Sequence, residues 1–452
     1  MRVSLFTQWL KLDRGRYLLL NPVSGNVRVV DREVADILAG DIETRPDDEK
    51  SGEQLLEILG KDGYLTDSTQ EEEKNRIMAA NSNVSQRPVY AHAIIITYRC
   101  NLECSYCINS SLLENSRSWL NKRISKDSVD KAFTVIGDMK EKTVRRHPIY
   151  LTGGEPLLPE NKEIVEYILN LSAHSGDKVA ANTNGYYLAK YVDLFEEYGT
   201  FTMAGVTLDG PPAVHDRRRK AKNGRSSFWR IVEGIEAIRP LSIHVGIRVN
   251  VDKSNIDALP ELVAFFEERG WAEDKHFSFC VCRVLRTGTP HDACLLTPLE
   301  AIQKIITMHT ESMLPRYMKY ECSYSNPGTL WGTLQGKGPL RPRLFYCPGL
   351  GETFIYDPHG DIYGCPQLVG NPQFRIGTYS PLFKLEPFLD TLKERTPLNM
   401  PECRTCKYAL LCGGGCGYNA YIENGSFMSP YCEETKAFLK YWVPFYFRRI
   451  IQ

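Results

Sequence analysis

The sequence predicts an α/β fold built around a partial (β/α)6 barrel of the TIM type, with a winged-helix-like domain before it and a cysteine-rich domain after it. The barrel is predicted because short apolar strands alternate with amphipathic helices from residue 91 onward, a pattern typical of a parallel sheet. The outer domains are predicted because residues 1–75 read as a hairpin with two helices, and because cysteines gather near the C-terminus. The expected divisions are 1–75, a linker at 76–90, the barrel at 91–315 and the cysteine-rich domain at 316–452.

Composition and charge narrow the classes of function that are possible for this chain. The 452 residues suffice for two or three domains, and the 55 basic and 55 acidic residues balance, so nothing favours nucleic-acid binding. The N-terminus lacks the apolar core of a signal peptide, and no run approaches the ~18 apolar residues of a membrane span. Fourteen cysteines in such a chain indicate metal or redox chemistry in a reducing cytoplasm.

The first domain begins with a predicted β-hairpin. Apolar runs at 17–20 and 27–30 flank a turn rich in Asn, Pro and Gly, which is a hairpin signal. Asp31 is then expected to cap a short helix that ends at Gly40.

A second helix is expected to begin at the capping box Ser51-x-x-Gln54 and to end near Gly60, before a strand at 63–66. The polar stretch 68–88 reads as a solvated linker or helix.

Six strands are predicted for the barrel, at 93–97, 149–152, 179–183, 201–208, 243–249 and 276–282. The helices between them are expected at 126–142, 162–172, 188–198, 228–238 and 256–269. A further helix, capped by Thr297, runs to about Met313. In α/β barrels the chemistry collects at the C-terminal ends of the strands, which is where the polar motifs of this chain fall.

Three cysteines in the spacing C-x-x-x-C-x-x-C, namely Cys100, Cys104 and Cys107, follow the first predicted strand. Three thiolates fill three corners of a four-iron cluster and leave one iron open for a small molecule. The same spacing also marks one face of a helix, where Cys would serve as a small hydrophobic residue. The scarcity of Cys favours the cluster.

This motif resembles the signature of radical S-adenosylmethionine (radical SAM) enzymes, and the later cysteines resemble the auxiliary-cluster (SPASM) extension of members that modify peptides and proteins. The resemblance covers residues 91 to 432. It implies a [4Fe–4S] cluster whose open iron is chelated by the amine and carboxylate of SAM. The first domain similarly resembles the PqqD-like element that binds leader peptides, whose sheet edge would pair with an extended leader. An inert N-terminal cap on the barrel is the alternative.

The resemblance also implies the residues that contact SAM. Gly153, Gly154 and Glu155 match the motif that holds the SAM amino group. Asn184 lies in a T-N-G run expected near the ribose. Tyr106, Asp209 and Arg219 are expected beside SAM, with Arg219 on its carboxylate, whereas Arg217, Arg218 and Lys220 read as a solvated basic loop.

The C-terminal third carries the seven cysteines of the SPASM pattern. By resemblance, Cys347, Cys365 and Cys416 would hold auxiliary cluster I, and Cys403, Cys406, Cys412 and Cys432 would hold auxiliary cluster II. Zinc ribbons also use C-x-x-C pairs, but seven cysteines exceed one tetrahedral site.

Cluster I lacks the usual further cysteine just upstream of its first ligand. Either the distant Cys322 completes it, or one iron stays open and binds a substrate thiolate, which is the favoured alternative. Three other cysteines, Cys280, Cys282 and Cys294, read as buried thiols.

Relatives that oxidise a sulfatase Cys or Ser carry an Asp directly after the second motif cysteine. Here Pro366 follows Cys365, which weakens that reading. The aromatic and basic tail at 438–449 is expected to dock over the surface of the barrel or of a cluster, although contact with a membrane surface is the alternative.

The sequence therefore predicts a cytoplasmic radical SAM/SPASM maturase. We expect it to take a hydrogen from a ribosomally made precursor peptide through a 5′-deoxyadenosyl radical and to install a cross-link, most plausibly a Cys thioether. An electron donor such as flavodoxin or ferredoxin is expected, and no catalytic acid or base is assigned. C–C cross-linking, epimerisation, protein oxidation and a non-catalytic metal-binding peptide carrier are the alternatives.

Overall fold

The computed structural model describes residues 1–40, 49–84, 90–114, 116–141, 147–287, 289–320, 329–334, 336, 338–347 and 351–451. The chain divides into two compact units. Unit 1 comprises Met1–Gln86, Cys322–Cys347 and Lys393–Gln452, and unit 2 comprises Arg87–Glu321 and Pro348–Leu392.

Unit 2 contains the predicted barrel. Its six parallel strands lie side by side in chain order: β6 (Ala91–Thr97), β8 (Ile149–Gly153), β9 (Val179–Thr183), β10 (Phe201–Thr207), β12 (His244–Val251) and β13 (Phe277–Arg283). All six strands predicted from the sequence are confirmed, most to within a residue or two. The α/β class and the partial barrel are therefore present.

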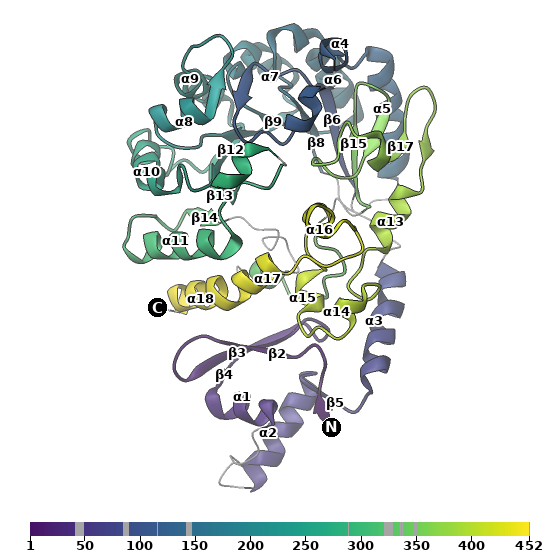
Figure 1. Ribbon diagram of the computed structural model, residues 1–452, viewed down its shortest axis with the longest axis vertical. Helices are drawn as coiled ribbons and strands as arrows, with labels where there is room; N and C mark the ends of the chain where they lie inside the picture. The colour runs from purple at the N-terminus through teal and green to yellow at the C-terminus, as the bar shows by residue number, and fades with distance from the viewer. Residues whose placement is uncertain are drawn as a thin grey trace. The chain divides into compact units, whose positions relative to one another are not determined.

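Helices cover the outer face of these strands (Figure 1). They are α5 (Lys126–Lys140), α6 (Lys162–Ser175), α7 (Val192–Tyr198), α9 (Phe228–Ile238), α10 (Leu259–Glu268) and α11 (Pro298–Thr310). Along β12 every second residue, from Val245 to Val251, is fully buried, whereas Arg248 between them is exposed. The strands thus bury one face and leave the other for ligands. The predicted capping box at Thr297 is confirmed.

The sheet continues beyond the six predicted strands. On one side β14 (Met318–Tyr320) pairs with β13. On the other side β15 (Thr353–Tyr356) pairs in parallel with β6, and β16 (Asp361–Tyr363), β17 (Arg375–Thr378) and β18 (Lys384–Leu385) follow as antiparallel neighbours. Part of the cysteine-rich region therefore belongs to the barrel sheet.

A buried hydrogen bond fastens the end of β6 to this extension. Tyr98 donates to Asp357 Oδ2 at 3.0 Å, and the backbone N–H groups of His359 and Asp361 donate to Asp357 Oδ1 at 2.9 Å each. Burial raises the pKa of the Asp357 carboxyl to about 6, and these donors only partly oppose that rise.

Unit 1 begins with the predicted hairpin, β3 (Arg16–Asn21) with β4 (Asn26–Asp31), and β2 (Gln8–Lys11) joins it as a third antiparallel strand. The helix α1 (Arg32–Ala39) follows and ends at Gly40, whose φ of 81° is left-handed. Asp31 precedes this helix as predicted, but its side chain makes no capping hydrogen bond.

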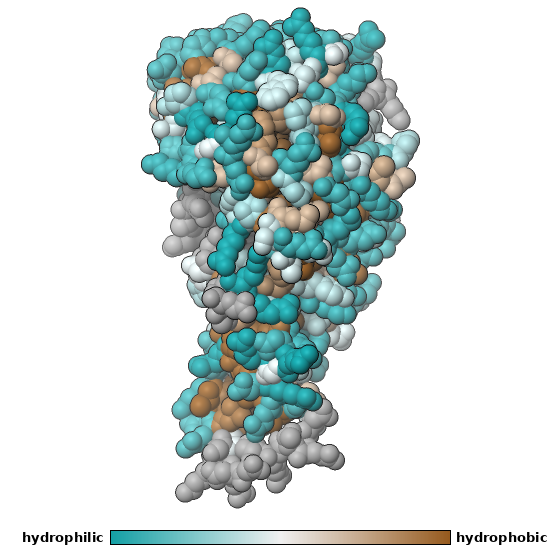
Figure 2. Space-filling model, turned by 90° about the vertical axis from the view of Figure 1, so that its left-hand side faces the viewer, coloured by the Kyte–Doolittle hydropathy of each residue, from teal (hydrophilic) through white to brown (hydrophobic). Residues whose placement is uncertain are grey.

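The second helix, α2 (Glu49–Lys61), begins two residues before Ser51, so the predicted capping box is wrong. The expected strand forms as β5 (Leu65–Thr66) and pairs with β1 (Arg2–Val3). A small core joins these elements around Leu19, Leu38, Leu59 and Tyr64. Hydrophobic residues also gather on the surface of this N-terminal domain (Figure 2), where Val23, Val29, Leu56 and Ile58 are exposed.

The polar stretch after β5 is helical, since α3 (Gln70–Val84) spans most of it. Ile77 of this helix is buried and packs with Phe6, Leu398 and Leu410 of the same unit. The segment is therefore more than a solvated spacer.

The C-terminal tail folds as α17 (Glu433–Ala437), a π-helical turn at Phe438–Trp442 and α18 (Val443–Ile451). Phe438, Leu439 and Trp442 are buried, and the π-helical turn contacts β2 of the N-terminal sheet. The tail is docked as expected, but the surface that this turn contacts is the N-terminal sheet and not the expected barrel or cluster surface. Within the part of the chain that the structure describes, no helix is both long enough and apolar enough to span a bilayer.

Asp357 makes a pH-dependent contribution to stability. Its folded-state pKa of about 6 lies above the ordinary value of 3.8, so the folded protein binds more protons between these pH values and stability falls as pH rises through them. The loss amounts to about 3 kcal/mol. We expect Asp357→Asn to remove this slope in anaerobic urea unfolding curves recorded from pH 4 to pH 7. An unchanged slope in the variant would contradict the assignment.

Candidate active site

The cysteine loop that follows β6 is held by a short strand pairing that the sequence did not predict. Within the loop, β7 (Leu102–Cys104) pairs antiparallel with β11 (Arg219–Ala221), which places Arg219 opposite Cys104. The backbone N–H of Ser105 also donates to the carbonyl of Arg218 at 3.0 Å. The segment after β10 thereby fixes the loop that carries all three motif cysteines.

The end of β8 packs directly against the start of the same loop. The N–H groups of Gly154 and Glu155 donate to the carbonyls of Thr97 and Arg99 at 2.9 Å each. A Cβ at Gly154 would stand 2.3 Å from the Tyr98 carbonyl oxygen, and one at Gly153 would stand 2.3 Å from that of Thr97. The two glycines are thus required for the close approach of two backbones.

Glu155 joins the ends of β8 and β9. Its buried carboxylate accepts hydrogen bonds from the Leu157 N–H at 2.8 Å, the Thr183 hydroxyl at 2.6 Å and the Asn184 N–H at 2.7 Å. Burial raises the pKa of Glu155, and these three donors oppose the rise. The carboxylate is therefore already well bound by the protein.

Asn184 reaches the cysteine loop itself. Its Nδ2 donates to Asn101 Oδ1 at 2.8 Å and lies 3.7 Å from the sulfur of Cys100. The Leu102 N–H lies 3.4 Å from the same sulfur. Amide donors around a cysteine sulfur are what iron–sulfur ligands require.

The three motif thiols fit a cluster better than they fit a hydrophobic core. Burial, with a further contribution from the charge of Glu155, raises the pKa of Cys100 to about 12. Burial also raises the pKa of Cys104 to about 11, although the nearby Arg219 opposes that rise. Burial also raises the pKa of Cys107. Each thiol is near another of the three, so bare thiolates would repel one another, whereas metal coordination deprotonates thiols outright. These residues would hold the SAM-binding cluster.

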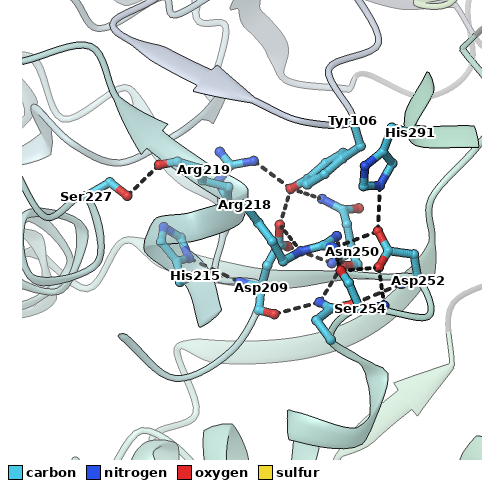
Figure 3. A network of polar contacts seen from close by, with 11 residues as sticks. Tyr106, Asp209, His215, Arg218, Arg219, Ser227, Asn250, Asp252, Ser254 and His291 are labelled. Carbon is cyan, nitrogen blue, oxygen red and sulfur yellow. Dashed lines mark hydrogen bonds and ion pairs between the residues drawn. The ribbon is translucent and has the colours of Figure 1, made fainter. Parts of the chain in front are cut away.

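Tyr106, Asp209 and Arg219, three of the residues predicted to contact SAM, touch one another beside Cys104 (Figure 3). Tyr106 donates to the buried carboxylate of Asp209, while Arg219 Nη1 donates to the Tyr106 oxygen at 2.9 Å. Burial raises the pKa of Asp209, and the nearby arginines oppose it. Burial lowers the pKa of Arg219, but Cys104, Tyr106 and Asp209 outweigh it and raise it well above its usual value.

Arg219 has a donor group left with which to bind an anion. Its Nε is buried and has no hydrogen-bond partner among the described residues. An unpaired buried N–H of a guanidinium is costly unless a ligand meets it. The carboxylate of SAM would satisfy it, which is consistent with the role expected for Arg219.

Arg218 corrects a sequence expectation. It was predicted in a solvated basic loop, but it is buried, and its Nη1 donates to Asp252 Oδ2 and to the Ser254 hydroxyl at 2.6 Å each (Figure 3). It is buried because the end of α8 (Pro212–Arg218) turns it toward the acidic loop that follows β12. Arg217 and Lys220 are exposed, as expected.

The sequence reasoning missed the polar groups that follow β12 and β13. Asn250 donates to the Tyr106 oxygen at 3.4 Å, and its N–H donates to Asp209 at 2.9 Å. His291 Nε2 lies 2.7 Å from Asp252 Oδ2. The run Asn250-x-Asp252-x-Ser254 at a strand end was the available signal.

The remaining barrel cysteines are less buried than predicted. Cys280, Cys282 and Cys294 are each only partly buried, and the sulfurs of Cys280 and Cys282 lie 3.9 Å apart. Cys280 and Cys282 alternate with the buried Phe279 and Val281 along β13, so they lie on the face that the outer helices do not cover. The prediction of buried thiols is therefore wrong.

In unit 1 the predicted ligands of auxiliary cluster II are neighbours. Burial, and then the proximity of Cys412, Cys406 and Cys432, raises the pKa of Cys403 to about 12. Cys403 lies in α14 (Pro401–Arg404), and Cys412 ends α15 (Ala409–Cys412). Four thiols that interact in this way form a plausible donor set for a cluster.

A fully buried arginine organises the loop between Cys412 and Cys416. Arg395 Nη1 donates to the Gly415 carbonyl at 2.8 Å, and Nη2 donates to that of Gly414 at 3.0 Å. Burial lowers the pKa of Arg395, while the charges of Cys416, Cys347, Cys412 and Cys403 oppose that change. A buried guanidinium near several thiols suits an anionic thiolate-bound cluster, because it needs a counter-charge.

The ligand set of auxiliary cluster I stays a prediction. Cys322 lies outside the described residues, so its suggested part in cluster I also stays a prediction. Among the residues described, no three His, Cys, Asp or Glu side chains converge closely enough to hold a single metal ion.

The radical SAM superfamily model matches residues 94–266, which span the first five barrel strands and the motif cysteines. The cysteine-type anaerobic sulfatase-maturating enzyme of Clostridium perfringens (strain 13 / Type A) is 23% identical over 378 residues, covering 76% of this chain and 94% of that enzyme.

Two solved structures share the fold. The native anSMEcpe with bound AdoMet superposes with a TM-score of 0.58 at 18% identity, covering 80% of this chain and 98% of that one. Streptococcus suis SuiB bound to the precursor peptide SuiA gives a TM-score of 0.53 at 14% identity, covering 95% and 98%.

The barrel, its cysteine loop and the family match together define a radical SAM domain. The chain is an enzyme that carries this domain over residues 94–266. Members of this superfamily use a [4Fe–4S] cluster and SAM, and Cys100, Cys104 and Cys107 are the donor set that fits the cluster here.

Gly154 offers a direct test of this site. Gly154→Ala would drive a Cβ to 2.3 Å from the Tyr98 oxygen and 2.4 Å from that of Arg99, so the cysteine loop must move. We expect a destabilisation of about 1–3 kcal/mol and a loss of SAM cleavage of about 100-fold. The matched control is Gly137→Ala on α5, where nothing lies within 4 Å of the added atom. Equal behaviour of the two variants in melting and 5′-deoxyadenosine assays would refute the packing argument.

Proposed function

We propose that this enzyme is a peptide maturase that removes a hydrogen from a ribosomally made precursor and closes a cross-link in it, most plausibly a thioether to a Cys of the peptide. The observation that carries the proposal is the combination, in one chain, of a SAM-cluster barrel with a second set of clustered thiols and a small N-terminal sheet domain. The likeness to SuiB, whose structure holds a precursor peptide, supports it.

The chain's own residues would position the reactants. When bound, the cluster and SAM supply a 5′-deoxyadenosyl radical, and the protein supplies position, charge and exclusion of water. Glu155 and Asn184 hold the loop end beside Cys100, and Arg219 presents an unpaired N–H toward an anion. The accessible face of β12 and β13, with Arg248, Cys280 and Cys282, would meet the peptide.

The auxiliary clusters are part of the proposal. Cys403, Cys406, Cys412 and Cys432 would hold one, and Cys347, Cys365 and Cys416 would hold another with an iron left open for a soft ligand. Closure of a thioether removes two electrons from the peptide. The 5′-deoxyadenosyl radical takes up one of them with the hydrogen atom, so an acceptor is needed for the other. Arg395 would stabilise the added negative charge near these thiols.

The N-terminal domain would bind the leader of the precursor. The three-stranded sheet runs β2-β3-β4, so β4 is an edge strand with one unpaired side among the described strands. Three of its six residues are exposed and the other three are half-buried, and Val29 is 44% exposed. An extended peptide adds to such an edge through backbone hydrogen bonds.

Turnover under strictly anaerobic conditions tests the reaction. With SAM, a reductant and the peptide encoded beside the gene, we expect 5′-deoxyadenosine together with a peptide that has lost two hydrogens. Alkylation of the peptide thiol should abolish that mass change if the bond is a thioether. Unmodified peptide despite 5′-deoxyadenosine release would remove the peptide claim, whereas bound zinc without SAM cleavage would favour a carrier.

Iron analysis belongs to the same experiment. The proposal expects iron well above one cluster per chain, and the loss of one cluster when Cys100, Cys104 and Cys107 are all replaced by Ala. That variant should cleave no SAM, because the ligands of the open-iron cluster are gone.

Leader binding is tested at the edge strand. We expect Val29→Asp to weaken binding of the precursor at least tenfold in a fluorescence titration, because it puts a charge where an apolar contact forms. Val23→Asp is the matched control, since Val23 is also 44% exposed but lies in the hairpin turn. Equal weakening in both variants, or in neither, would exclude β4 as the docking edge.

A further inference from the structure

A pocket of about 320 Å³ lies beside the cysteine loop in unit 2. Ser105, which sits between Cys104 and Tyr106, lines it together with Arg218, Ser254, His291 and Cys294. These residues come from the loop after β6 and from the segments after β10, β12 and β13, so the pocket opens at the C-terminal ends of the barrel strands. That is the end of a barrel at which substrates react.

The pocket contains a histidine whose orientation is set by a buried carboxylate. Asp252 is fully buried, and its Oδ2 lies 2.7 Å from His291 Nε2. Burial raises the pKa of Asp252, but hydrogen bonds from Ser254 and Arg218 outweigh it and hold the pKa below its ordinary value. Asp252 is therefore a carboxylate that only accepts, and His291 Nε2 must be the N–H that donates to it.

This arrangement leaves the second ring nitrogen as a base. When Nε2 carries the proton of the neutral ring, Nδ1 carries a lone pair. Figure 3 shows the imidazole beside the Tyr106 ring, with Nε2 directed toward Asp252. Nδ1 has no hydrogen-bond partner among the described residues. A carboxylate that fixes the tautomer of an imidazole at the mouth of a pocket is the arrangement used for general-base catalysis.

We propose that His291 is the general base of the peptide modification, with Asp252 as its positioning residue, and that the pocket receives the nucleophilic side chain of the peptide. The proposal rests on the proposed function and names a residue for the proton that function must release.

The step balances. One hydrogen atom leaves a peptide carbon and ends in 5′-deoxyadenosine. The peptide thiol gives its proton to His291 Nδ1 as the carbon–sulfur bond forms, and an oxidised iron–sulfur cluster, when bound, would supply the acceptor for the remaining electron. The peptide thus loses two hydrogens, one as an atom and one as a proton.

The surroundings of His291 favour its acting as a proton acceptor. The ionisable groups that touch it or line the same pocket are Asp252, Tyr106, Arg217, Arg218 and Cys294. Asp252 stabilises the imidazolium that forms. The two arginines attract the thiolate that results. Both charges formed by the proton transfer, on the imidazolium and on the thiolate, are therefore stabilised.

The test separates proton transfer from hydrogen abstraction. The fully loaded enzyme is given a peptide deuterated at the carbon that reacts, and both deuterium in 5′-deoxyadenosine and cross-linked product are measured. We expect His291→Gln to keep the deuterium transfer but to form product about 100-fold more slowly at pH 7. Glutamine retains an N–H toward Asp252 but has no nitrogen that takes a proton. The control is His174→Gln, an exposed histidine on α6.

Two further readouts would not respond to a merely structural role. In His291→Gln the ratio of product to deuterium transfer should rise toward wild type as pH approaches the ordinary thiol pKa of about 8.5. In His291→Ala added imidazole should restore product.

The outcomes distinguish the two proposals. A wild type that transfers no deuterium from the peptide would refute the proposed function itself. A wild type that transfers deuterium while His291→Gln forms product at the normal rate would overturn only the role of His291. Loss of both deuterium transfer and product in His291→Gln, without rescue of His291→Ala, would show a role in binding and would also overturn the assignment.

Discussion

The site depends on the close contact between the end of β8 and the backbone that leads into the cysteine loop. That loop has little regular structure of its own, so its shape is imposed by its neighbours. The Gly154 and Glu155 N–H groups hold its entry, the carboxylate of Glu155 holds the end of β9 against it, and β11 pairs with its middle. Three strand ends therefore determine where three sulfurs lie, which is what a cluster with one open corner demands.

A network of buried charged side chains adds to the backbone contacts that hold the site. Around Cys104 the protein buries Arg218, Arg219, Asp209 and Asp252 in one connected network. Buried charges are costly unless each has partners, and every member of this network has at least one. Among the described residues, the groups of this network without a hydrogen-bond partner include the Nε of Arg219 and the second ring nitrogen of His291. Both are therefore positioned to meet molecules that the protein itself does not contain.

Much of the barrel could be predicted from the sequence, because the local spacing of apolar residues indicates each strand and helix. The six strands and the capping box at Thr297 required only neighbours along the chain. The β15–β18 extension, the β7–β11 pairing and the burial of Arg218 could not be predicted, since each depends on contacts between distant segments. Arg217, Arg218 and Lys220 look alike in sequence, and only the acidic loop after β12 separates Arg218 from the other two. The cofactor ligands could be named by resemblance, but the groups that position them could not.

The pairing of β15 with β6 has a consequence for biogenesis. Tyr98 and its partner Asp357 are 259 positions apart in the chain, and both are needed to fasten the entry to the cysteine loop. Contacts of such separation form late, and a ribosome delivers residue 357 only after most of the barrel has emerged. The entry to the cysteine loop can therefore be fastened only after residue 357 has been synthesised, when most of the polypeptide already exists.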